Sequence, residues 1–134
     1  MKDLAEVIAK YESTMLRFSF HEVMHLLDTF LREINKHWTA NIKVMEGDFE
    51  HNATLKQALA DNFHMLRIAT VLVHPVAPRG TELIFEYLGL NDESFWSWKR
   101  IREPIYAFMN DPETHRLKEL PPRFDFFPKH PSQF

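Results

Sequence analysis

Apolar positions at helical spacing dominate the first part of the chain, and nowhere do apolar and polar residues alternate as in a half-buried strand. A first helix is predicted from Leu4 to about Met15. A second, amphipathic helix is predicted from about Ser19 to about Trp38, because Ser19 and Glu22 have the spacing of a capping box. Its apolar stripe consists of Leu16, Phe20, Val23, Met24, Leu27, Phe30, Leu31 and Ile34.

Capping and breaking residues delimit two further helices. Thr54, followed three residues later by a glutamine, forms a second capping box and opens a helix that is predicted to reach about Val73. Pro75 stops this helix because proline has no N–H to donate. Pro78 suits the first turn of the next helix, and Gly89 suits the position just after its end.

The last third of the chain is rich in aromatic residues and proline. A short helix is predicted over about Glu93–Ile101, and residues 104–134 are predicted to form a tail that wraps over a surface. Four to five helices joined by short loops predict an all-α antiparallel helical bundle, with residues 1–134 as a single domain. The expected core consists of Phe20, Met24, Leu27, Leu31, Leu59, Phe63, Leu66 and Ile84.

Composition narrows the classes of function. The absence of cysteine excludes a disulfide framework and thiolate chemistry. No apolar run approaches the length of a membrane helix, and the N-terminus lacks the apolar region of a signal peptide, so we expect a cytoplasmic protein. With a formal net charge of −3, any nucleic-acid contact must come from a local patch. The three glycines are too far apart for a phosphate-binding loop.

The segment His21–His25 matches the His-Glu-x-x-His pattern of zinc proteases. Two histidines one turn apart can share a metal ion, and the glutamate between them can act as a general base. Both histidines fall on the polar side of the helical wheel, however, and Glu22 is expected to complete the capping box of Ser19. We therefore predict a solvated helix face and no metal, and a metal site at His21 and His25 is the alternative.

Four segments follow one another in a suggestive order. The first is Phe18–Phe20, which leads into a helix that ends with Ile34–Trp38. The second is Leu66–Pro78, which ends in a Pro-x-x-Pro pattern. The third and fourth are Thr81–Gly89 and Pro121–Lys129. In this order and spacing they resemble the anticodon-binding domain of methionyl-tRNA synthetases, a family of class I aminoacyl-tRNA synthetases. The resemblance covers most of the chain.

This resemblance implies a helical domain that binds tRNA at the anticodon, and not DNA or a membrane. In the family, such a domain follows a catalytic domain that makes methionyl-adenylate from ATP. The His-Ile-Gly-His and Lys-Met-Ser-Lys-Ser motifs of that catalytic domain do not occur in this chain. The chain alone is therefore expected to have no catalytic residues and no cofactor. It is either a C-terminal fragment of a synthetase-like enzyme, which would bind ATP elsewhere, or a free-standing paralogue.

The same resemblance places the RNA contact at the end of the second helix and in the loop after it. The expected RNA-binding residues are Asn35, Lys36, His37, Trp38, Asn41 and Lys43. The lysines would neutralise phosphates, the asparagines would bond to base edges, and His37 or Trp38 would stack on an unpaired base. The Pro-Trp pair that the family usually has here is replaced by Asn41–Met45.

Two other classes of function stay open. One is a metal-binding helical bundle or zinc hydrolase that uses His21 and His25. The other is a protein-interaction helical domain, which the negative net charge would suit.

Overall fold

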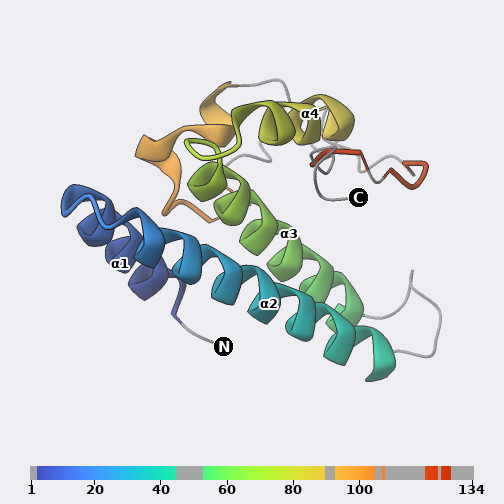
Figure 1. Cartoon of the computed structure of the whole chain (residues 1–134). Coiled ribbons are helices and arrows are strands. Elements are labelled where there is room, and N and C mark those ends of the chain that lie inside the picture. The colour runs from blue at the N-terminus through green and yellow to red at the C-terminus, as the bar shows by residue number, and fades with distance from the viewer. Residues whose placement is uncertain are drawn as a thin grey trace, which may run out of the picture. The chain divides into compact units, whose positions relative to one another are not determined.

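The computed structural model describes residues 3–44, 53–89, 93–104, 107, 120–123 and 125–127 (Figure 1). Within these ranges the chain is helical and contains no strand, which confirms the prediction of an all-α helical bundle. The elements are α1 (Leu4–Leu16), α2 (Phe20–Val44), α3 (Ala53–Val73), α4 (Pro78–Leu88) and the 3-10 turns η1 (Glu93–Trp96) and η2 (Trp98–Arg100). They belong to two compact units, residues 1–72 and residues 73–134.

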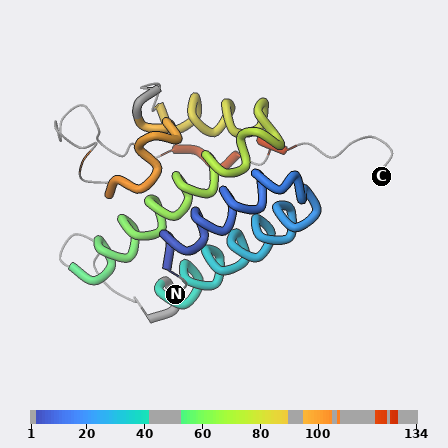
Figure 2. Tube along the Cα trace, turned by 90° about the vertical axis from the view of Figure 1, so that its left-hand side faces the viewer, coloured from blue at the N-terminus to red at the C-terminus, as the bar shows by residue number. Residues whose placement is uncertain are grey.

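The first unit is built from α1, α2 and most of α3. Figure 2 shows α1 lying between α2 and α3. The hydroxyl of Tyr11 on α1 donates a hydrogen bond of 2.8 Å to the carbonyl of Leu72 on α3. The buried apolar side chains of this unit are Val7, Ile8 and Tyr11 of α1, Val23, Leu26, Leu27 and Phe30 of α2, and Ala58, Met65, Ile68, Ala69, Val71 and Leu72 of α3.

The expected core is wrong for half of its members. Leu27 is buried, with an exposed fraction of 3%, whereas Phe20, Met24, Leu31 and Leu66 are 59%, 49%, 43% and 38% exposed. Leu59, Phe63 and Ile84 are half-buried. The apolar arc of α2 is wider than the face that its neighbours cover. At 100° per residue, the buried arc is centred roughly 50° away from the middle of the whole stripe.

The turn between α1 and α2 is a Schellman motif with a bulky residue in the left-handed position. The N–H of Phe18 donates to the carbonyl of Met15 at 2.9 Å, and the N–H of Ser19 donates to Thr14 at 3.2 Å. Phe18 has φ = 57°, a conformation in which glycine is usual. A side chain in this region costs roughly 1–2 kcal/mol because Cβ crowds the following carbonyl.

The predicted capping box at the start of α2 is wrong. Its second bond would join the Glu22 carboxylate to the backbone N–H of Ser19, but that N–H donates to Thr14. Glu22 instead accepts a bond of 3.2 Å from Arg17. The helix nevertheless starts at Phe20, close to the predicted position, and runs well past Trp38 to Val44 because no glycine or proline interrupts it.

The ends of α3 and α4 follow the sequence signals. The helix α3 stops at Val73, whose carbonyl accepts from the N–H groups of Val76 and Ala77. The helix α4 runs from Pro78 to Leu88, and Gly89 closes it with φ = 66°. Among the described residues, no helix combines the length and the apolarity needed to cross a lipid bilayer.

The second unit departs from prediction after α4. The single helix expected over 93–101 is two 3-10 turns, because Ser97 between them has an extended backbone. The ring of Trp96 stacks on Phe85 of α4 with 3.8 Å between centroids.

Residues of the predicted tail within 120–123 and 125–127 contact α4. The hydroxyl of Tyr87 donates to the carbonyl of Pro121, and the ring of Tyr87 meets Phe126 edge-on at 5.4 Å. A Cβ on Gly80 would collide with the ring of Phe127 and would lie 2.7 Å from the carbonyl of Phe126. The glycine therefore allows this segment to approach the helix. The rest of residues 104–134 lies largely outside the described ranges.

Candidate functional site

The residues proposed for RNA binding lie on the last turns of α2. Asn35 and Lys36 are exposed, and His37, Trp38 and Asn41 are half-buried. Lys43 belongs to the same helix, but its side chain lies outside the described residues. At 100° per residue, positions 36 and 43 lie within roughly 20° of each other around the axis of α2.

A second face of this helix end is tied to α3 by polar side chains. The amide nitrogen of Asn62 lies 3.1 Å from Nδ1 of His37, and it also donates to the carbonyl of Ala58 at 2.8 Å. The amide nitrogen of Asn41 lies 3.2 Å from the same ring nitrogen and donates to the carbonyl of His37 at 2.8 Å. The Asn41 amide nitrogen also lies 3.3 Å from Nε2 of His37. Amide nitrogens only donate and an unprotonated ring nitrogen has one lone pair, so Nδ1 can accept from one of the two amides at a time.

The structure therefore divides the six residues. It brings His37 and Asn41 together as part of an internal network, and it leaves Asn35 and Lys36 in solvent. The hydroxyl of Thr39 donates to the backbone carbonyl of Asn35 at 2.8 Å. This bond does not involve the side-chain amide of Asn35. The half-buried Trp38 presents only part of its ring.

Asn62 is the residue beside the candidate site that the sequence analysis missed. It is 7% exposed and lies in α3 in line with Ala58, Met65 and Ala69. A polar residue in a buried apolar stripe needs a partner, because burying an amide without hydrogen bonds costs free energy. That interruption of the stripe was the available signal, and its partner is the histidine at the end of α2.

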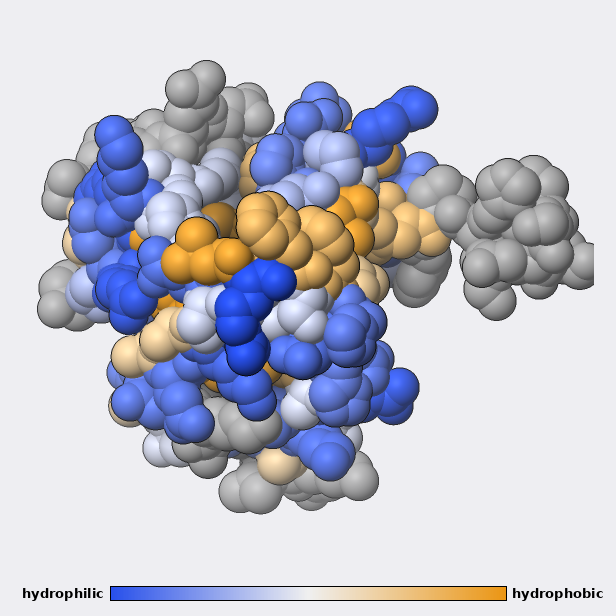
Figure 3. Space-filling view, turned by 60° about the vertical axis from the view of Figure 1, so that its left-hand side comes forward, coloured by the Kyte–Doolittle hydropathy of each residue, from blue (hydrophilic) through white to orange (hydrophobic). Residues whose placement is uncertain are grey.

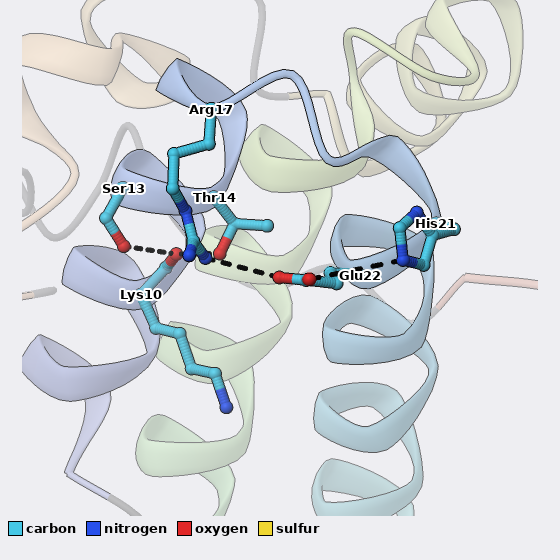
Figure 4. A network of polar contacts seen from close by, with 6 residues as sticks. All are labelled: Lys10, Ser13, Thr14, Arg17, His21 and Glu22. Carbon is cyan, nitrogen blue, oxygen red and sulfur yellow. Dashed lines mark hydrogen bonds and ion pairs between the residues drawn. The ribbon is translucent and has the colours of Figure 1, made fainter.

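The His-Glu-x-x-His segment lies at the opposite end of α2. The side chain of His21 is 85% exposed, and His25 is also exposed, as predicted for a solvated face. Figure 4 shows the carboxylate of Glu22 between Arg17 and His21. One oxygen lies 3.2 Å from Arg17, and the other lies 4.0 Å from Nε2 of His21.

In the part of the chain that the structure describes, no three histidine, cysteine, aspartate or glutamate residues gather closely enough to hold a metal ion. The carboxylate that a zinc hydrolase would use as general base is instead held in an exposed ion pair.

Comparison with known proteins relates the chain to part of a tRNA ligase. It is 26% identical over 121 residues to the methionine–tRNA ligase of Bacillus subtilis (strain 168). The match covers 90% of this chain and 18% of that protein, so the chain spans less than a fifth of the relative's length. No protein-family model matches the chain. No solved structure matches it either.

Proposed function

We propose that this chain is a tRNA-binding accessory domain of a methionyl-tRNA synthetase-like tRNA ligase, and that it contacts the anticodon loop with the last turns of α2. The observation that carries the proposal is the similarity of nearly the whole chain to a segment of a methionine–tRNA ligase. The partners are tRNA and a catalytic domain, and ATP is bound by that catalytic domain. The site of action is the cytoplasm.

The faces of α2 support different roles for the expected RNA-binding residues, some of which contact phosphates and others bases. Lys36, with Lys43 on the same face, neutralises phosphates and so positions the RNA without reading its sequence. The exposed amide of Asn35 bonds to the edges of unpaired bases, and the open part of the Trp38 ring stacks on one of them.

The hydrogen bonds to α3 give the other two residues a positioning role. His37 and Asn41 fix the end of α2 against α3 through Asn62. Both stay half-exposed, so they border the same surface. A rigid helix end holds the base-reading groups in place more accurately than a loop does.

Fluorescence anisotropy with labelled tRNA at several salt concentrations tests the proposal. The variant Lys36→Ala/Lys43→Ala is expected to bind tRNA more weakly. The slope of log affinity against log salt concentration should be smaller by roughly one to two units, because tRNA binding releases fewer counterions when fewer phosphates are contacted. The matched control is Lys10→Ala/Arg79→Ala, which removes two exposed cations elsewhere. If both pairs of substitutions change affinity and slope equally, the end of α2 is not the RNA interface.

A separate substitution tests the positioning role. Asn62→Leu keeps the exposed face intact but removes the partner of His37. We expect weaker tRNA binding with an unchanged salt slope, because no phosphate contact is lost. A smaller salt slope in this variant would contradict the proposal that Asn62 positions the helix end and makes no phosphate contact.

A further inference from the structure

An exposed tryptophan with basic residues close to it in the chain lies in the second unit, at the turn η2. The side chain of Trp98 is 41% exposed, and Lys99 and Arg102 are exposed as well. Apolar exposure alone does not mark a binding site, because hydrophobic side chains also reach the surface among hydrophilic ones on the face drawn in Figure 3. The combination of an aromatic ring with cations is what distinguishes this turn.

The structure gives the aromatic residues of this region different roles. Trp96 stacks on Phe85 of α4 with 3.8 Å between ring centroids, and the buried Phe95 meets Trp96 edge-on at 5.0 Å. Ser97 has an extended backbone, with φ = −70° and ψ = 133°, and so separates Trp98 from the turn that carries the other two rings. Phe95 and Trp96 therefore contribute to packing, whereas a large part of the Trp98 ring stays at the surface.

The backbone of residues 97–103 distributes the side chains over three sides. The N–H groups of Arg100, Ile101 and Glu103 donate to the carbonyls three residues earlier, at 3.1, 3.1 and 3.0 Å. Because a 3-10 turn has three residues per turn, side chains three apart lie on the same side. One side carries Trp98 and the buried Ile101, the second carries Lys99 and Arg102, and the third carries Arg100 and Glu103.

Ion pairing leaves a positive excess on this turn. The guanidinium of Arg100 donates to one carboxylate oxygen of Glu103 from Nε at 2.9 Å and from Nη2 at 2.7 Å. Glu103 is the one acidic residue in the sequence of 97–103, which contains three basic residues. The side with Lys99 and Arg102 is therefore basic, in a chain whose formal net charge is −3.

An aromatic ring and neighbouring cations are the groups that bind unpaired nucleotides. The ring stacks on a base, because every base has a flat face, and the cations neutralise phosphates of the strand. Lys99 and Arg102 are one turn apart, or roughly 6 Å along the axis at about 2.0 Å per residue, so they can contact different phosphates of one strand. Lysine is depleted at the centres of protein–protein interfaces, which makes a protein partner the poorer fit.

We propose that Trp98, Lys99 and Arg102 form a second tRNA contact, in which the indole stacks on an unpaired base and the two cations neutralise phosphates beside it. This contact rests on the proposed function in one respect, since it takes tRNA as the ligand of the chain. It goes beyond that function because it places a binding surface in the second unit, away from α2, at residues that the expected RNA-binding set does not include.

Fluorescence anisotropy with labelled tRNA tests the stacking contact in the intact chain. Trp98→Ala is expected to weaken the affinity about tenfold, which is the order of a lost base–aromatic stack, and to leave the salt slope unchanged. Trp98→Phe keeps a flat ring and should retain most of the affinity. The control is Phe20→Ala, which removes an aromatic side chain that is 59% exposed on α2, at the end far from Lys36. An affinity of Trp98→Ala equal to that of Phe20→Ala would overturn the stacking contact.

Lys99→Ala/Arg102→Ala tests the phosphate contacts, and its fold should be retained because both residues are exposed. We expect weaker tRNA binding and a salt slope smaller by roughly one to two units, because fewer counterions are released. Lys10→Ala/Arg79→Ala is again the matched control for two exposed cations. An affinity and a slope that match those of the control would remove η2 from the RNA interface.

Tryptophan fluorescence reports the stacking directly. Trp38→Phe removes the indole of the other proposed surface and leaves Trp96 and Trp98 as the tryptophans of the chain. Addition of tRNA is expected to quench the emission of this variant, and the quenching should be lost in Trp38→Phe/Trp98→Phe. Undiminished quenching in the double variant would show that the base does not stack on Trp98.

The two RNA surfaces can fail separately. If Lys36→Ala/Lys43→Ala weakens tRNA binding but Trp98→Ala and Lys99→Ala/Arg102→Ala do not, the contact at η2 is refuted and the proposed function stands. The reverse result keeps the contact at η2 and refutes the assignment of the interface to α2. A wild-type chain that binds no tRNA at about 100 μM, the weak end of non-specific binding, overturns both.

Discussion

At the scale of single residues, the hydroxyl of Tyr11 completes the end of α3. Pro75 follows this helix and has no N–H, and the N–H of Val76 donates to Val73, so the carbonyl of Leu72 needs another donor. Tyr11 supplies it at 2.8 Å, and burial raises the pKa of that hydroxyl. We predict that Tyr11→Phe lowers the free energy of unfolding by about 1–3 kcal/mol, measured in urea.

The control for this prediction is Ser13→Ala. The hydroxyl of Ser13 donates to the carbonyl of Lys10 at 3.0 Å, but it is exposed. Water replaces this bond when the hydroxyl is removed, so stability should change by less than about 0.5 kcal/mol. Equal losses in both variants would mean that Tyr11 has no special capping role.

Phe18 gives a prediction of the opposite sign. Phe18→Gly should raise the stability of the protein by roughly 0.5–1 kcal/mol, because the relief of backbone strain exceeds the extra entropy of glycine in the unfolded chain. Phe18→Ala keeps a Cβ in the left-handed conformation and should give no such gain. Urea unfolding compares the three proteins, and a gain in the alanine variant would contradict the strain argument.

His64 makes stability depend on pH. Burial of the ring, followed by the charge of Arg67, lowers the pKa of His64 below its ordinary value of 6.5, and Asp61 opposes the shift. The unfolded chain then binds the proton first as the pH falls. The stability is therefore complete above about pH 6.5 and is lost as the pH falls below that value toward the folded pKa.

We predict that the free energy of unfolding of the wild type falls more steeply between about pH 7 and pH 5 than that of His64→Leu, because the variant lacks this linked proton. Parallel curves for the wild type and His64→Leu would show that this histidine titrates alike in both states.

At the scale of elements, the sequence defined helix type and helix ends better than helix faces. Pro75, Pro78 and Gly89 act through local backbone chemistry, and the helices end where these residues predict. The buried face of α2 depends on where α1 and α3 lie, and a wide apolar arc is compatible with several placements. The 3-10 turns were missed for the same reason, because the stacking of Trp96 on Phe85 is a tertiary contact.

The rotation of α2 can be measured with two substitutions of similar chemistry. Leu27→Ala should cost about 2–5 kcal/mol because Leu27 is buried. Met24→Ala should cost less than about 1 kcal/mol because Met24 is half exposed. Thermal or urea unfolding of both variants tests this, and equal losses would place Met24 in the core after all.

The candidate site could also be predicted only in part from the sequence. Asn35 and Lys36 are exposed as a binding role requires, and the sequence pattern alone suggested them. The hydrogen bonds that link the end of α2 to Asn62 depend on how closely α3 approaches α2. Asn62 follows its partner His37 by 25 residues in the chain. A helical wheel drawn for α2 contains no information about that approach.

At the scale of the whole molecule, the apolar, basic and histidine-containing surfaces of α2 lie on different parts of that helix. The exposed Phe20 and Met24 and the exposed Lys36 occupy different sides of α2, and the His-Glu-x-x-His segment lies at the far end of the helix from Lys36. Two histidines and an ion-paired glutamate on an open surface provide neither the third ligand nor the enclosed pocket of a catalytic zinc site.

We therefore predict that the purified chain contains no stoichiometric zinc and that a chelator leaves its melting temperature unchanged. Metal analysis by mass spectrometry after dialysis into metal-free buffer measures the first quantity. His21→Ala serves as the control, because a bound metal would be lost in that variant. One zinc per chain in the wild type and none in the variant would restore the hydrolase alternative.

The left-handed Phe18 has a consequence for protein engineering. A screen that rewards heat resistance alone would select Phe18→Gly early, because a glycine there relieves the backbone and removes an exposed ring. Such a screen would raise stability while removing an exposed aromatic side chain from the surface. Libraries built on this scaffold should therefore be sorted for binding activity as well as for melting temperature, so that stability is not gained by discarding a surface side chain.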